Sequence, residues 1–217
     1  MSWARESGFS QAELRALKPL KTPSLIQGFL NDLRSNFEED GDTCHSPRSV
    51  LASGKAHCVE GAILAAAAMR LHGRPPLLVE LLTTADDDPH VIAVFRERGC
   101  WGAVGKTNHA VLRYRDAVYR NLRELVMSFF HEYFLNSNGE KTLRSYTRPM
   151  SLVQFDARGW TVSEEDITYI PKKLEDARHY DLVDGRQIKT LRVADAIEID
   201  AGKLVVEKPP RRRVQTF

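Results

Sequence analysis

One cysteine of this 217-residue chain stands where a thiol gains reactivity, at the predicted start of a helix. Cys58 follows the helix-breaking segment 54–57 and precedes an Ala-rich apolar run that Gly73 ends. The positive end of a helix dipole favours thiolate over thiol, and the unpaired N–H groups there can stabilise an oxyanion. Because the thiolate is the nucleophile in thiol catalysis, Cys58 is the first candidate for covalent chemistry. A small buried apolar side chain is the alternative interpretation.

A histidine suited to proton transfer with this thiol is His90, which begins a β-branched run after an acidic loop. It would act first as general base and then as general acid toward the leaving group; a structural histidine is the alternative. A third residue would orient the imidazole. Asn108 is the candidate, with Asp116 as a charged competitor and Thr107 as a weaker one, and Asn108 could equally be a turn residue.

Periodicity predicts the elements that must position these residues. Helices are expected over 10–20 with Ser10 as N-cap, from Pro23 to Phe37, from Cys58 to His72 and over 118–135. Strands are expected over 77–83, 90–96 and 100–104, and the segments 196–199 and 204–207 are expected to form a hairpin.

This order predicts an α+β fold in which a buried helix carrying Cys58 packs on an antiparallel sheet. We place a domain boundary near Pro149. Residues 1–149 would form the core with its N-terminal helices, and residues 150–217 a C-terminal extension packed on that core.

Three segments resemble the transglutaminase-like branch of the papain-like cysteine superfamily: 53–62 (SGKAHCVEGA), 88–95 (DPHVIAVF) and 99–102 (GCWG). In that family a Gly-polar-Cys segment opens a helix, a His follows on a strand, and a Gly–Trp strand comes next. The resemblance covers about 47–108. The segments 112–115 (LRYR) and 122–125 (LREL) are similar to those of an uncharacterised bacterial group within the superfamily.

The resemblance implies a papain-like core with Cys58 as nucleophile and His90 as base. The family carries an Asp shortly after the Trp, in the pattern W-x-x-L-D, and Gly105 holds that position here. Asn108 would then match the third position only on an offset or bulged strand.

Composition limits the partners. The net charge of +2 argues against nucleic acid, and the basic run 211–213 is interpreted as a solvated tail. Three cysteines without a C-x-x-C spacing support neither a disulfide framework nor a thiolate zinc site. No signal peptide or membrane-spanning run is recognised, so a cytoplasmic protein is expected.

These observations predict a thiol-dependent acyl-transfer enzyme: an amide or peptide hydrolase, or a transglutaminase-like transferase, that acts on a small-molecule or peptide substrate. Neither a metal nor an organic cofactor is expected, because nucleophile and base suffice. Lys106 and the Arg113–Arg115 segment could form a basic rim for a carboxylate or phosphate, or be ordinary surface charge. The alternative function is a catalytically inactive transglutaminase-like binding or scaffold module.

Overall fold

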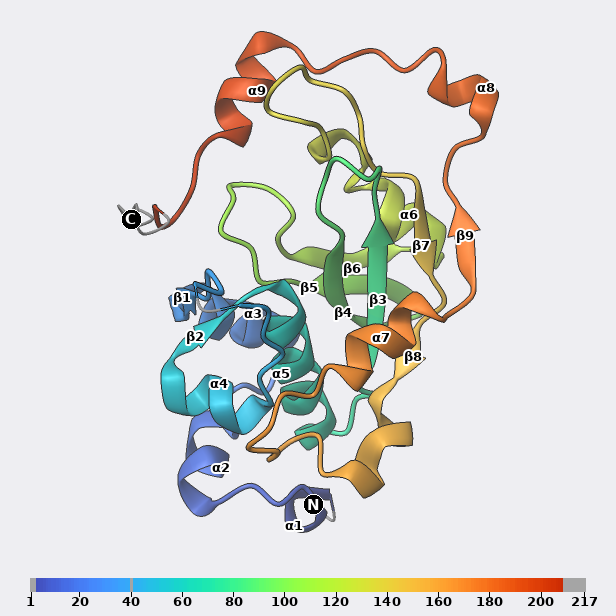
Figure 1. The fold of residues 1–217 in the computed structure, drawn as a ribbon. Coiled ribbons are helices and arrows are strands. Elements are labelled where there is room, and N and C mark those ends of the chain that lie inside the picture. Colours follow the sequence, from blue (N-terminus) through green and yellow to red (C-terminus); the bar gives the residue numbers. More distant parts are fainter. Residues whose placement is uncertain (1–2, 40, 209–217) are drawn as a thin grey trace, which may run out of the picture.

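Three runs rich in apolar and β-branched residues form the centre of an antiparallel sheet in the computed structural model, which describes residues 3–39 and 41–208 (Figure 1). The strand order is β6-β5-β4-β3-β7-β9, and β8 also pairs with β3. The strands of this sheet are β3 (Leu77–Leu82), β4 (His90–Glu97), β5 (Cys100–Val104), β6 (Arg115–Tyr119), β7 (Ser145–Thr147), β8 (Met150–Ser151) and β9 (His179–Asp181). The three central strands match the predicted ones within about one residue.

The helices that precede the sheet in the chain cover one of its faces (Figure 1). The α-helices are α1 (Trp3–Glu6), α2 (Gln11–Leu17), α3 (Pro23–Asp32), α4 (Pro47–Ser53), α5 (Cys58–Leu71), α6 (Leu122–Met127), α7 (Tyr169–Glu175), α8 (Gly185–Ile188) and α9 (Ala196–Gly202). Two 3-10 helices, η1 (Phe130–Glu132) and η2 (Leu152–Arg158), and a short parallel pair, β1 (Arg34–Ser35) with β2 (Lys55–Ala56), complete the elements. Among the described residues, no helix combines the length and apolar character that crossing a bilayer requires.

Helix α5 is the buried centre of the larger hydrophobic cluster. Its residues from Ala62 to Met69 are shielded from solvent, and they pack with Leu78 of β3 and with Val91 and Ala93 of β4. The run of alanines lets the helix approach the sheet closely, because small side chains keep the two backbones near one another. The approach is closest at Gly61, where an added Cβ would lie only 2.4 Å from the Cβ of Lys106. This packing fixes the N-terminus of α5 against the strands.

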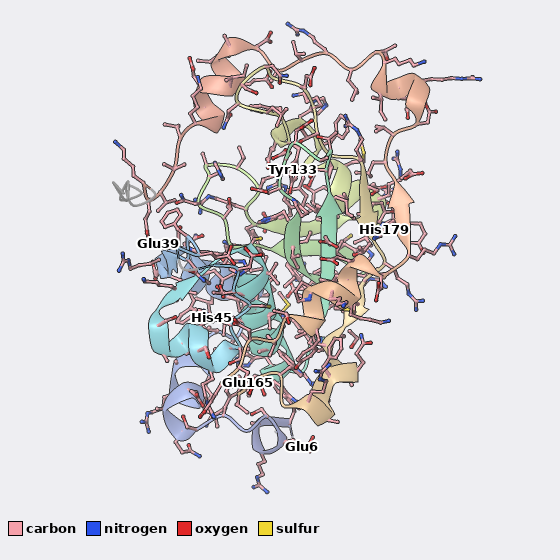
Figure 2. All side chains as sticks on the ribbon, in the orientation of Figure 1. Glu6, Glu39, His45, Tyr133, Glu165 and His179 are labelled. Carbon is pink, nitrogen blue, oxygen red and sulfur yellow. The ribbon has the colours of Figure 1, made fainter. Side chains whose placement is uncertain are left out.

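The other face of the sheet has its own apolar cover. Val79, Ile92 and Val94 pack there against α6 and the aromatic residues that follow it. Figure 2 shows all the side chains, with Tyr133 beside the upper part of the sheet and the exposed Glu6 at the lower end of the molecule. The sheet is therefore buried on both sides, which explains why its central strands are almost continuously apolar.

The register of the central strands places the start of β4 beside the chain that follows β5. His90 is opposite Leu81 of β3, and Ala93 is opposite Val104, the last residue of β5. The β4–β5 pairing runs without a shift from Glu97 to Ala93. The chain that continues from Val104 consequently passes alongside the first residues of β4.

Two predicted helices were too long. The helix that begins at Pro23 ends at Asp32 instead of Phe37, because Leu33 is extended and Arg34 then donates its N–H to Gly54. The segment expected to be one helix from Val118 divides into the end of β6, α6 and η1. Its first residues pair with β5, and the Asn121 side chain caps a new helix.

The predicted C-terminal hairpin was wrong. Residues 196–202 form helix α9, because Asp195 and Glu198 build a capping box that starts a helix there. The segment after α9 runs to the chain that follows β5, where Val206 donates its N–H to Asn108. The basic run 211–213 lies outside the described residues.

The predicted boundary near Pro149 falls between two strands of one sheet. Strands β7 and β8 both pair with β3. Beyond this point, Leu152, Trp160 and Leu174 belong to the same hydrophobic cluster as α5. The C-terminal segment thus supplies part of the sheet and part of the main core.

Candidate active site

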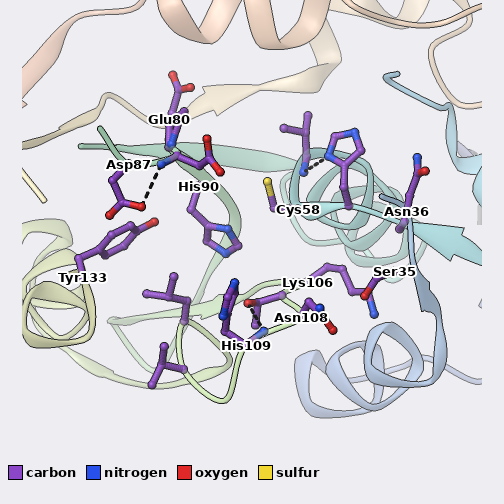
Figure 3. A pocket seen from close by; sticks show the side chains of 18 of the residues that line it. Ser35, Asn36, Cys58, Glu80, Asp87, His90, Lys106, Asn108, His109 and Tyr133 are labelled. Carbon is purple, nitrogen blue, oxygen red and sulfur yellow. Dashed lines mark hydrogen bonds between the residues drawn. The ribbon is translucent and has the colours of Figure 1, made fainter. Parts of the chain in front are cut away.

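A pocket of about 730 Å³ brings the start of α5, the start of β4 and the chain after β5 together (Figure 3). Cys58, His90, Thr107 and Asn108 all line it. Asp116 does not: it is exposed on β6. The other sides of the pocket are lined by residues 35–38 and Asp42, by Tyr133 and its neighbours at the end of η1, and by α7. Two of the predicted site residues, Cys58 and His90, therefore face one cavity although 32 positions separate them in the chain.

Cys58 is the first residue of α5 and is partly exposed. The helix begins there because His57 is its N-cap, with extended backbone and a ring Nδ1 that accepts the N–H of Val59 at 3.3 Å. The Glu60 carboxylate returns to the N–H of His57 at 3.0 Å, so helix start and thiol position are fixed together.

The surroundings of Cys58 favour its thiolate. Burial raises the pKa of this thiol, but the side chains of His57 and His90 interact with the sulfur and lower the pKa to about 5. Cys44 is the contrast, since burial and nearby carboxylates raise its pKa to about 12. Cys100 is partly exposed on β5 and is not among the pocket residues.

His90 is buried, with 6% of its surface exposed, and its ring lies near Cys58 in the pocket (Figure 3). Its Nε2 atom has no hydrogen-bond partner within residues 3–39 and 41–208. Gly105 is next to that atom: a Cβ at position 105 would stand 3.3 Å from Nε2. The position beside the imidazole is thus held by a residue without a side chain.

Asn108 does not take the predicted third place. Its side-chain amide donates to the carbonyl of Glu207 at 2.8 Å and accepts the N–H of Glu207 at 2.9 Å. The β4–β5 pairing contains no offset that would carry Asn108 to the ring, and Thr107 instead accepts the N–H of His109. Asn108 therefore fastens the C-terminal segment to the pocket rim rather than orienting His90.

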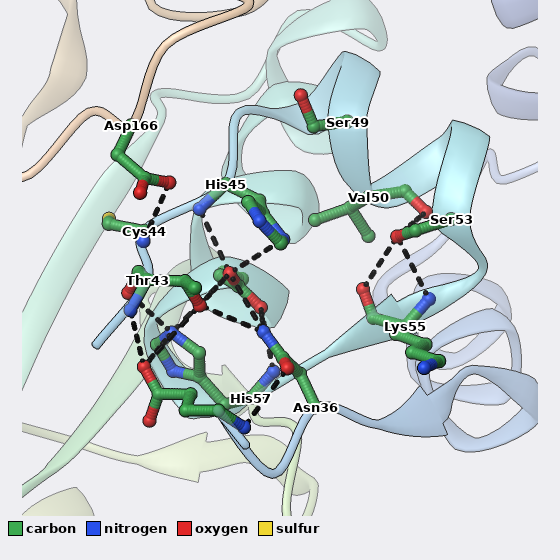
Figure 4. Close-up of polar contacts among 12 residues, drawn as sticks. Asn36, Thr43, Cys44, His45, Ser49, Val50, Ser53, Lys55, His57 and Asp166 are labelled. Atoms are coloured by element: carbon green, nitrogen blue, oxygen red, sulfur yellow. Dashed lines mark hydrogen bonds and ion pairs between the residues drawn. The ribbon is translucent and has the colours of Figure 1, made fainter. Parts of the chain in front are cut away.

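A buried carboxylate organises the chain next to the start of α5, in the network of polar contacts around Asn36, Thr43 and His57 that Figure 4 shows. Glu60 is fully buried and accepts hydrogen bonds from the side chains of Asn36 and Thr43 and from the N–H of His45. The nearby ring of His57 has Nε2 3.0 Å from the carbonyl of Thr43. Burial lowers the pKa of His57, but Cys58 and the carboxylates of Glu60 and Glu38 outweigh this and raise it to about 9. Protonation of the ring beside the thiolate is therefore favoured, and in that form Nδ1 carries a proton and no longer accepts the N–H of Val59.

The predicted basic rim does not form at this pocket. Lys106 lines it, but its ammonium donates to the carbonyl of Leu33. Arg113 and Arg115 are not among the lining residues, and Arg115 pairs with Glu132 at 2.6 Å. Among the described residues, seven that line the pocket carry carboxylates, namely Glu38, Asp42, Glu80, Asp87, Asp88, Glu132 and Glu175. The rim is acidic instead.

Two pocket residues that sequence reasoning did not select have buried polar atoms without partners: Oε2 of Glu80 and the hydroxyl of Tyr133. Both side chains are more than nine-tenths buried. Burial, with contributions from Glu175 and Cys58, raises the pKa of Glu80 to about 7. Because buried polar groups are nearly always paired, these two atoms are free to form hydrogen bonds with a polar group that enters the pocket. The available signal was Glu80 itself, a charged residue inside the apolar run 77–83.

Comparison with known proteins gives no further assignment, because no protein-family model and no curated protein matches the chain. Within residues 3–39 and 41–208, no group of three or more His, Cys, Asp or Glu side chains could hold a metal ion.

Proposed function

We propose that the protein is a thiol-dependent acyl-transfer enzyme with a papain-like, transglutaminase-like core. The observation that carries the proposal is a partly exposed cysteine at a helix N-terminus, with its pKa lowered to about 5, in one pocket with His90. Thiol catalysts need such a cysteine, because the thiolate is the reacting species.

The reaction begins with attack of the Cys58 sulfur on the carbonyl carbon of an amide or ester. The N–H groups in the first turn of α5 stabilise the oxyanion that forms. His90, which has taken the proton of the Cys58 thiol, gives it to the leaving amine or alcohol, the C–N or C–O bond breaks, and a thioester remains on Cys58. Water or an amine, deprotonated by His90, then releases the acyl group and restores the thiolate.

His57 and Glu60 act on this reaction through position and charge. The protonated His57 ring stabilises the thiolate, and Glu60 holds both the ring and the helix start in place. His57 and Glu60 therefore hold and stabilise the sulfur. Gly105, in contrast, has no side chain that could orient His90.

The proposal is tested by turnover of a panel of nitrophenyl esters and anilides by the wild type, Cys58→Ala and His90→Ala. A Cys100→Ala variant is the matched control, since it removes a thiol that does not line the pocket. We expect turnover to vanish in Cys58→Ala and to fall by about 100-fold or more in His90→Ala, with the control unchanged. Full turnover by Cys58→Ala would exclude covalent catalysis at this residue.

A catalytically inactive binding module is the second candidate. The observation in its favour is the unpartnered Nε2 of His90 beside Gly105, because a triad requires a group there. Such a module would bind ligands in the pocket with Cys58 intact and turn none of them over. Saturable binding combined with wild-type turnover equal to that of Cys58→Ala would select this candidate.

A further inference from the structure

The pocket that contains Cys58 has an acidic wall, formed by Glu80, Asp87, Asp88 and Glu175. Asp88 and Glu175 are exposed, and Asp87 accepts hydrogen bonds from Thr142 and from the N–H of Asp88. Glu80 differs from the other three, because it is 7% exposed and its Oε2 is buried without a partner.

We propose that Glu80 binds a primary ammonium group of the substrate, with the acidic wall attracting the cation into the pocket. This inference rests on the proposed acyl-transfer function, whose substrate class it specifies.

The charges around Glu80 support a cationic ligand. No ion pair to Glu80 occurs among the described residues, and the only Lys or Arg that lines the pocket, Lys106, already donates its ammonium to Leu33. A buried carboxylate without a counter-ion is costly, and an incoming ammonium removes that cost with a charge-assisted hydrogen bond. An anionic substrate would meet repulsion from the whole wall.

The described neighbours of Glu80 include no cationic partner for its carboxylate. On β3 it lies opposite Val91, and its own N–H is bonded to the hydroxyl of Thr147 from β7. The titratable groups that face it are Glu175 from α7 and Cys58 from α5. Both are acidic, so each opposes ionisation of Glu80. A bound cation would promote it, and binding should strengthen as pH rises through about 7.

The experiment measures calorimetric binding of n-pentylamine, pentan-1-ol and pentanoate, which share a tail and differ in charge. Cys58→Ala is used beside the wild type so that binding is observed without thiol chemistry. We expect the amine to bind at least about tenfold more tightly than the alcohol, and pentanoate to bind more weakly still. A preference that persists in Cys58→Ala supports the ammonium site whether or not the enzyme proposal survives.

Glu80→Gln isolates the carboxylate, and Asp42→Asn is the matched control, because Asp42 is an exposed carboxylate on another side of the same pocket. We expect Glu80→Gln to weaken amine binding by about tenfold or more and Asp42→Asn to change it by less than about twofold. Equal binding of amine and alcohol, or wild-type amine affinity in Glu80→Gln, would overturn the proposal.

A second measurement serves if Glu80→Gln does not fold. For the wild type, amine affinity at pH 8 should exceed that at pH 6 by about tenfold, because Glu80 ionises between these values while the amine stays protonated. A flat or falling dependence would contradict the assignment. Failure of esterase turnover with the ammonium preference intact would instead count against the catalytic proposal alone.

Discussion

The pH dependence of Cys58 alkylation is the prediction that the local geometry determines best. With a pKa of about 5, almost all of the Cys58 sulfur is thiolate at pH 6.5. A free cysteine with a pKa near 8.5 is about 1% thiolate at that pH. The thiolate fraction therefore favours Cys58 by roughly 100-fold.

The rate itself changes less than the thiolate fraction. A thiolate of lower pKa is a weaker nucleophile, and a Brønsted coefficient of 0.4–0.5 over about 3.5 pH units reduces its reactivity roughly 25- to 55-fold. We expect iodoacetamide to alkylate Cys58 only about two to four times faster than free cysteine at pH 6.5. The informative quantity is the midpoint of the pH–rate profile, which should lie near 5.

His57→Asn tests the physical cause. Asparagine is a favourable N-cap, so the start of α5 is retained while the charge of the ring is removed. We expect the midpoint to rise by at least about one unit, equivalent to about 1.4 kcal/mol. All proteins carry Cys100→Ser, and the buried Cys44, whose pKa is about 12, stays silent. A wild-type midpoint near 8.5, or the same midpoint in His57→Asn, would refute the reasoning.

Three further predictions concern the supporting contacts. Glu60→Gln should lower the free energy of unfolding in urea by about 2–3 kcal/mol, because an ionised acceptor of several buried hydrogen bonds is lost, whereas the exposed Glu165→Gln should change it little. Burial raises the pKa of Glu60, but the charge of His57 and the hydrogen bonds that the carboxylate accepts outweigh this and lower it. The contribution of Glu60 to the free energy of unfolding is therefore complete above about pH 4.5 and is lost as pH falls below that value. A wild type no more acid-sensitive than Glu60→Gln would contradict this. Asn108→Ala should cost about 1 kcal/mol and speed tryptic cleavage after Lys203, with the Cys58 alkylation midpoint unchanged; a shifted midpoint would mean that Asn108 acts on the site after all.

Local patterns predicted the elements that hold the nucleophile and base. The apolar run after Cys58 and the β-branched run after His90 each specify one element, and their packing follows from burying both. The helix expected from Val118 was too long, because pairing with β5 outweighs helical spacing in its first residues and α6 begins only at Leu122. The hairpin expected at the C-terminus was wrong because the capping box at Asp195 was not recognised.

The partners of the two reactive groups could not be predicted from spacing alone. His57 and Glu60 form a capping-box pair adjacent to Cys58, but their effect on the thiol depends on burial and on the loop that contributes Thr43. The neighbour of His90 is a glycine, and only the strand register identifies it. Glu80 lies within an apolar strand. Its proposed role in binding could not be predicted from the sequence, because that role depends on the lack of a partner for its carboxylate among the described residues.

The central claim is tested most directly by trapping the acyl-enzyme. The protein is mixed with p-nitrophenyl acetate, quenched in acid within the first turnover and mapped by peptide mass spectrometry. The account predicts a burst of one nitrophenol per chain and an acetyl thioester on Cys58, absent in Cys58→Ala and formed more slowly in His57→Asn. A thioester located on Cys100, or equal acetylation in Cys58→Ala, would contradict it.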